Sequence, residues 1–93
     1  MFSYDEENIF AKIINGEIPA DTVYEDDDFI CFRDIAPQAP VHLLIIPKHH
    51  KVPSIAAIEK DDAQWIGQMM VRASAVAKEQ GLNETGYRLV FNC

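Results

Sequence analysis

Residues 36–50, APQAPVHLLIIPKHH, constrain the fold more than any other part of the chain. Pro37 and Pro40 hold the backbone extended and outside regular pairing, because proline fixes φ and has no N–H. The apolar run 41–47 then predicts a strand, and Pro47 ends it because proline cannot donate to a sheet ladder. The stretch therefore predicts a strand with histidines near both ends. These histidines are either a catalytic cluster or the polar ends of a strand.

The residues before this stretch predict a helix followed by a hairpin. Apolar residues recur at helical spacing, and Asn15-Gly16 ends that helix. Residues 23–24 and the β-rich run 29–35 then form two strands, separated by a turn at 26–28. The apolar helical positions are Ile9, Phe10, Ile13 and Ile14.

The residues after the stretch predict a longer helix and a last strand. Residues 53–62 form a short helical turn and a cap, and the helix runs from residue 61 or 62 to residue 80. Gly81 fits the position after its end, and residues 87–92 form a strand. The apolar stripe of the helix comprises Trp65 or Ile66, then Met69, Ala73, Val76 and Ala77. About four strands, mostly antiparallel, with two helices on one face predict an α+β domain.

Composition limits the partners of the chain. Ninety-three residues fit one small domain, and a net charge of −7 opposes broad nucleic-acid binding. No apolar run approaches the roughly 20 residues that span a membrane. The two cysteines are too few for a disulfide framework, and the acidic N-terminus lacks the basic and apolar regions of a signal peptide. We therefore expect a cytoplasmic protein without nucleic-acid or membrane partners.

Asp34 and His42 are the first candidates for a functional site. Asp34 ends an apolar strand, where a carboxylate accepts hydrogen bonds either from the backbone of the turn 35–37 or from the hydroxyls of a sugar. His42 begins the next strand and shares a face with Leu44 and Ile46. It is either a histidine bonded to a backbone carbonyl or a functional group. The residues alone leave both alternatives open.

The remaining candidates are an apolar slot, an amide and a histidine pair. The slot could hold a flat ring, or its residues could be ordinary core. Asn92 lies at a strand end, where its amide can donate and accept. His49 and His50 are expected to be exposed, and without a third ligand at useful spacing they are a weak metal signal, so we expect no metal and no cofactor. The slot residues are Ile9, Phe10, Ile13, Phe32 and Ile35.

Three segments, in this order, resemble the histidine triad (HIT) family in its HINT-like, nucleotide-hydrolysing branch. They are IFxKIIxGEIP at 9–19, DIxPQAPxHxLxIPKxH at 34–50 and GYRLVxN at 86–92. The resemblance covers roughly residues 7–93, and the combination of motifs at these spacings is specific. It implies an α+β domain that pairs into a homodimer with one continuous sheet.

The resemblance also implies a substrate and roles for the candidate residues. The family binds purine nucleoside monophosphates and cleaves a bond at the α-phosphorus, typically that of a phosphoramidate. By position, Asp34 takes the ribose hydroxyls, His42 supports the histidine cluster of the family, and Asn92 lies near the phosphate. For His49 the match is to a position outside the chemistry, so His49 is still expected to be an exposed loop residue. The residues implied for the base pocket are Ile9, Phe10, Ile13, Phe32 and Ile35.

The defining motif of the family, His-φ-His-φ-His-φ-φ with φ apolar, does not occur in the 93 residues. It should follow Asn92, and it carries the histidine that forms a covalent nucleotidyl intermediate. We therefore expect a single HIT-like domain over residues 1–93 that is incomplete at its C-terminus. As the N-terminal part of a nucleotide hydrolase it would be inactive alone. The alternative is a non-enzymatic dimerising or nucleotide-binding remnant.

Overall fold

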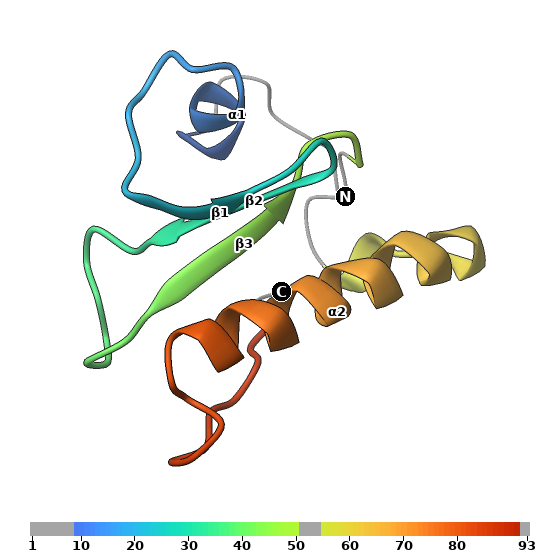
Figure 1. Cartoon of the computed structure of the whole chain (residues 1–93). Helices are drawn as coiled ribbons and strands as arrows, with labels where there is room; N and C mark the ends of the chain where they lie inside the picture. Colours follow the sequence, from blue (N-terminus) through green and yellow to red (C-terminus); the bar gives the residue numbers. More distant parts are fainter. Residues whose placement is uncertain (1–8, 51–54, 92–93) are drawn as a thin grey trace. The chain divides into compact units, whose positions relative to one another are not determined.

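The computed structural model describes residues 9–50 and 55–91, which fall into two compact units. The first unit is described over residues 9–50 and the second over residues 55–91. Figure 1 shows helix α1 and three strands in the first unit, and helix α2 in the second.

Helix α1 spans Ile9–Ile14 and ends where the sequence predicts. Gly16 has a φ of 77°, a left-handed conformation that only glycine adopts without strain. Its N–H donates to the carbonyl of Ile13 at 3.1 Å, and the N–H of Glu17 donates to the carbonyl of Lys12 at 2.8 Å. These two bonds form a Schellman motif, which satisfies carbonyls that the last helical turn leaves unpaired.

The sheet has the order β1-β2-β3, and both strand pairs are antiparallel. Its strands are β1 (Thr22–Glu25), β2 (Phe29–Arg33) and β3 (Leu43–Pro47). The predicted hairpin and the predicted 41–47 strand are therefore confirmed. Strand β1 is longer than the predicted 23–24, and β2 and β3 are shorter than the predicted 29–35 and 41–47. Strand β2 lies between the other two and is buried from Phe29 to Phe32. Its near-continuous apolar sequence matches its place as the central strand, with a ladder partner on each side.

The register of β2 and β3 decides which side chains share a face. Phe32 lies opposite Leu44, and Ile30 lies opposite Ile46. Cross-strand partners point to the same side of a sheet, so these four side chains form one face. The ring of Phe10 on α1 lies 6.4 Å from that of Phe32, at an interplanar angle of 41°. Helix α1 therefore lies against this face, as Figure 1 shows.

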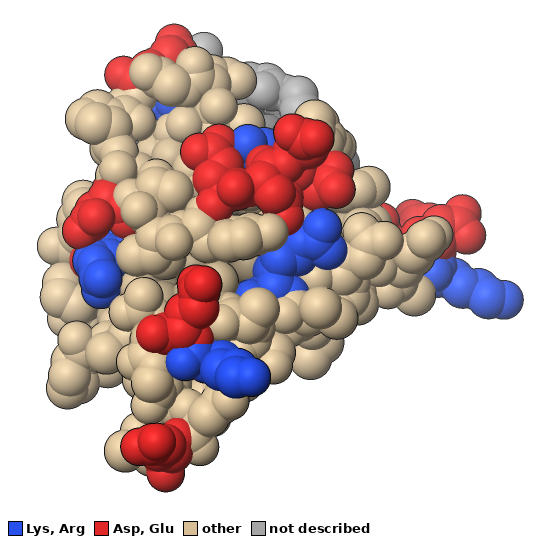
Figure 2. Space-filling model, viewed as in Figure 1, with Lys and Arg blue, Asp and Glu red and all other residues tan. Residues whose placement is uncertain are grey.

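The acidic run before β2 forms the predicted turn. One carboxylate oxygen of Asp26 accepts hydrogen bonds from the N–H groups of Asp28 and Phe29, both at 2.8 Å. Such a bond lets an aspartate side chain substitute for backbone pairing in a turn. Lys48, which follows β3, lies 2.6 Å from the Glu25 carboxylate. Figure 2 shows acidic side chains in several separate groups on the face in view, the largest of them in the upper middle with basic side chains beside it.

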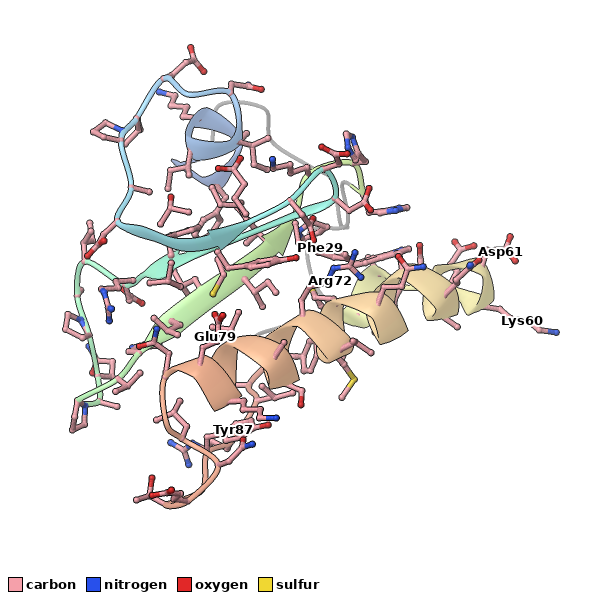
Figure 3. All side chains as sticks on the ribbon, viewed as in Figure 1. Phe29, Lys60, Asp61, Arg72, Glu79 and Tyr87 are labelled. Carbon is pink, nitrogen blue, oxygen red and sulfur yellow. The ribbon has the colours of Figure 1, made fainter. Side chains whose placement is uncertain are left out.

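The second unit contains the long predicted helix. Two 3-10 turns, Ile55–Ala57 and Lys60–Asp62, precede helix α2, which spans Ala63–Glu79. Gly81 has a φ of 75° and donates to the carbonyl of Lys78, so α2 also ends in the predicted left-handed cap. Figure 3 shows the side chains along this helix, including Arg72 and Glu79. The buried positions of the predicted apolar stripe are Met69, Val76 and Ala77.

The predicted strand 87–92 is not a strand over its described residues. Residues 87–91 have no regular secondary structure, and residue 92 lies outside the described residues. Tyr87 and Leu89 are 45% and 44% exposed, and Val90 is 66% exposed. A strand requires a neighbouring backbone that takes its N–H and C=O groups. In the described part of the chain no strand pairs with 87–91, so its β-type sequence does not produce a strand.

The α+β class is nevertheless confirmed, because an antiparallel sheet and two helices form the described part of the chain. Three strands are present there rather than about four. No helix in the described ranges combines the length and the apolar character needed to cross a bilayer.

Candidate functional site

Asp34 and His42 face one another at the point where strands β2 and β3 separate. The last ladder pair is Arg33 with Leu43, and the N–H of Asp34 donates to the carbonyl of His42 at 3.0 Å. The two side chains continue the alternation of the face that carries Phe32 and Leu44. The sheet therefore places a carboxylate and an imidazole on the side that α1 covers.

The carboxylate of Asp34 is held from both of its oxygens. Oδ1 accepts a hydrogen bond from the backbone N–H of Ala36 at 2.8 Å, which is the turn bond that the sequence left open as one alternative. Oδ2 lies 3.5 Å from Nε2 of His42, and the Asp34 side chain is 21% exposed. A carboxylate offers about four lone-pair sites, so acceptor capacity remains on each oxygen.

The imidazole of His42 has a polar neighbour at each nitrogen. Nδ1 accepts a hydrogen bond from the backbone N–H of Gln38 at 3.0 Å. A nitrogen that accepts carries no proton, so the neutral ring holds its proton on Nε2, toward Asp34. The 3.5 Å separation is that of an electrostatic contact at the outer limit of hydrogen bonding. The two ring nitrogens contact a backbone N–H and a carboxylate, so the alternative in which His42 bonds a backbone carbonyl is wrong.

Gln38 is the residue that the sequence analysis did not single out. Its backbone N–H binds His42, and its side-chain amide donates to the carbonyl of Ala36 at 3.2 Å. The loop between β2 and β3 is thereby bonded to both side chains, through Ala36 to Asp34 and through Gln38 to His42. The two prolines at 37 and 40 indicated an irregular loop, but nothing in the pattern indicated that its backbone would reach the histidine.

The residues predicted for an apolar slot are only partly brought together. Phe10 is 40% exposed and contacts Phe32, which is 4% exposed. Ile13 is half-buried on α1. Ile35 is 88% exposed in the loop, so it is not packed with the aromatic pair. Ile9 begins α1, but its side chain is not among those described.

The other candidates lie apart from this site or outside the described residues. His49 and His50 are exposed, as predicted, and Nε2 of His49 lies 2.8 Å from the backbone carbonyl of Asp27. Asn92 lies outside the described residues. Across residues 9–50 and 55–91, no group of three or more His, Cys, Asp or Glu side chains is arranged to hold a metal ion.

One buried titratable group lies on β2. Cys31 is 3% exposed and forms no disulfide, and burial raises the pKa of its thiol to about 11. Its partner across the ladder is Ile45, so it lies on the face opposite to Phe32 and Leu44. A thiol with a raised pKa is a poor nucleophile at neutral pH, so Cys31 is a core residue, as predicted from its apolar neighbours.

Comparison with known proteins gives a consistent set of relatives. The family model described as "Scavenger mRNA decapping enzyme C-term binding" matches residues 7–93. The purine nucleoside phosphoramidase of Escherichia coli K12 is 47% identical over 87 residues, which cover 94% of this chain and 72% of that protein.

Two solved structures are similar to this one. A HIT family hydrolase from Legionella pneumophila has 51% sequence identity and a TM-score of 0.85, over 90% of this chain and 74% of that chain. A histidine triad protein from Clostridium difficile has 40% identity and a TM-score of 0.88, over 98% of this chain and 78% of that chain.

Proposed function

The chain belongs to the histidine triad (HIT) family, and we propose that it forms part of an enzyme that hydrolyses purine nucleoside phosphoramidates. The relative that supports this substrate class is the E. coli phosphoramidase, at 47% identity. The proposed ligand is a purine nucleoside monophosphate or its phosphoramidate, and the proposed compartment is the cytoplasm. We also propose that residues 1–93 belong to one HIT-like domain.

The observation that carries the proposal is the half-buried carboxylate of Asp34 beside an aromatic face. Asp34 is held by Ala36 and His42, yet one acceptor site on each oxygen remains for a ligand. Two neighbouring hydroxyls of a ribose need two acceptors. Phe32 lies two residues earlier on the same face and is 4% exposed. The ring that can pack against a purine is therefore that of Phe10, which contacts Phe32 and is 40% exposed. In this proposal Ile9, Ile13 and Ile35 complete the base pocket, and Asn92 lies near the phosphate.

The proposed chemistry is covalent. A histidine nitrogen attacks the α-phosphorus, the phosphorus–nitrogen bond to the amine breaks, and the amine leaves with a proton from a neighbouring acid. Water then cleaves the phosphorus–histidine bond and releases the nucleoside monophosphate. In this scheme His42 supports the reacting histidines and is not the nucleophile.

We propose that the 93-residue polypeptide does not turn over an adenosine phosphoramidate by itself. Its histidines are His42, His49 and His50. Both nitrogens of His42 already face protein groups, and His49 and His50 lie at the opposite end of β3. This supports a second candidate function, nucleotide binding without hydrolysis, for this polypeptide.

We propose further that the protein is a homodimer. The supporting observation is the group of exposed apolar side chains in the second unit, which a second copy would cover. Sedimentation at micromolar concentration should show a dimer, and a monomer alone would contradict this part of the proposal. These side chains are Ile55, Ile58, Met70, Val71, Tyr87, Leu89, Val90 and Phe91.

Titration calorimetry with AMP tests the binding site. Asp34→Ala should weaken AMP binding about tenfold or more, because a hydrogen bond to a charged group contributes about 1.5–3 kcal/mol. Asp61→Ala is the matched control, since Asp61 is an exposed aspartate of the second unit. Equal AMP affinity in the wild-type chain and in Asp34→Ala would show that Asp34 does not hold the ribose.

A further inference from the structure

We infer that His42 is a positioning residue for sugar recognition. It orients the Asp34 carboxylate, and this orientation determines the preference for a ribose over a sugar without the 2′ and 3′ hydroxyls. The inference rests on the proposed nucleotide site. It adds to that site a residue which acts through Asp34 rather than on the phosphorus. It differs from the supporting role in chemistry that the family resemblance implies.

The contacts of His42 lead to this inference. Its ring nitrogens face the Gln38 N–H at 3.0 Å and the Asp34 Oδ2 at 3.5 Å. The side chain is 31% exposed, so the contact with Asp34 is partly shielded from water. Because Gln38 fixes the acceptor nitrogen, the Nε2–H is fixed toward the carboxylate.

The consequence for Asp34 is a restricted rotation about its Cβ–Cγ bond. Terminal carboxylate torsions are broad, so a single hydrogen bond from Ala36 leaves the plane of the group loosely defined. A second neighbour on the other oxygen defines that plane. The two unused lone-pair sites then have fixed directions, which matters for two adjacent hydroxyls and not for a sugar without them.

Two substitutions separate the two contacts of His42. In His42→Asn the side-chain oxygen stands close to the place of Nδ1 and can still accept from Gln38, but nothing reaches Asp34. In His42→Gln the amide nitrogen stands close to the place of Nε2 and can still donate to Asp34. His49→Asn is the matched control, because His49 contacts the carbonyl of Asp27 at the other end of β3.

The measured quantity is the ratio of dissociation constants for 2′,3′-dideoxy-AMP and AMP, obtained by calorimetry on the 93-residue chain. The wild-type ratio should be about ten or more. His42→Asn should lower it about three- to fivefold, the effect of a modest, partly exposed contact. His42→Gln and His49→Asn should leave it within about twofold. In an Asp34→Ala background, His42→Asn should have no further effect on the ratio.

The outcomes distinguish this inference from the proposed function. A wild-type ratio near one would overturn the ribose assignment and the positioning role with it. A wild-type ratio of about ten that His42→Asn leaves intact would overturn the positioning role alone. Equal loss in His42→Asn and His42→Gln would also overturn it, because a general structural effect would then explain both.

A measurement without ligand tests the geometry directly. Nitrogen-15 spectra of the histidine rings at alkaline pH, where imidazoles are neutral, should show the Nε2–H form for His42. Asp34→Asn should shift the ring signals of His42 and leave those of His49 unchanged. An Nδ1–H form of His42, or ring signals of His42 that do not change in Asp34→Asn, would overturn the inference. This test does not depend on nucleotide binding.

Discussion

Strand β2 and the segment 87–91 have similar sequences and different structures. FICFR and YRLVF are both five residues long, rich in β-branched or aromatic residues and bounded by polar or turn residues. In β2 the Phe29 and Phe32 side chains are 1% and 4% exposed, whereas Leu89 and Phe91 are each 44% exposed. The composition of a strand is therefore not sufficient. Strand β2 has a partner on each side within the stretch 22–47, and the described residues provide none for 87–91.

Hydrogen exchange should show the largest difference between the two segments. The amides of β2 should exchange at least about 10³-fold more slowly than those of 87–91. An amide that is hydrogen-bonded in the sheet exchanges only when the fold opens, whereas an amide without such a bond exchanges through local motion. Mass spectrometry after exchange in deuterated buffer measures this ratio. Protection of 87–91 that grows with protein concentration would mean that a second copy supplies the missing pairing, and would favour the homodimer.

Matched phenylalanine truncations should give the next largest difference. Phe29→Ala should lower the free energy of unfolding by about 3–5 kcal/mol, since Phe29 is almost completely buried and its removal leaves a cavity. Phe91→Ala should change it by no more than about 0.5 kcal/mol, as is typical of exposed positions. Urea denaturation followed by circular dichroism measures both. Similar losses in the two variants would show that 87–91 is packed as tightly as β2.

The buried thiol of β2 should make stability fall at alkaline pH. Burial raises the pKa of Cys31 from 9.0 to about 11, so between these values the unfolded chain loses a proton that the folded chain keeps. The free energy of unfolding is therefore unaffected by this thiol below pH 9. It should decrease by about 1.4 kcal/mol per pH unit between pH 9 and pH 11. Urea denaturation at several pH values measures this slope, and Cys31→Ala should flatten it. An equal slope in wild type and variant would show that the thiol is not buried in solution.

The ion pair between Lys48, which follows β3, and Glu25, at the end of β1, should have the smallest effect on stability. Lys48 and Glu25 lie 2.6 Å apart, with side chains 18% and 48% exposed. Lys48→Ala should cost less than about 1 kcal/mol of unfolding free energy, and the cost should shrink in high salt. Thermal denaturation at two salt concentrations measures it. A loss of several kcal/mol that salt does not change would instead indicate that the aliphatic part of Lys48 is packed in the core.

The local sequence determined both helices, their glycine ends and the first three strands. These features depend on neighbours within a few residues: Gly16 and Gly81 adopt left-handed backbone conformations that other residues avoid, and Pro47 ends the ladder. The alternation in VHLLIIP also predicted that His42 shares a face with Leu44 and Ile46, which is consistent with the register opposite β2.

Only the tertiary structure decided what Asp34 and His42 contact and whether 87–91 is a strand. The two residues are eight positions apart, and their 3.5 Å approach follows from the β2–β3 register and from a loop backbone that reaches back to the imidazole. The sequence pattern places side chains on faces of the sheet, but it does not state which backbone groups of a loop will bond to those side chains. A strand, likewise, is a property of two backbones, so the sequence of residues 87–92 alone predicted a strand that the described fold leaves without a partner.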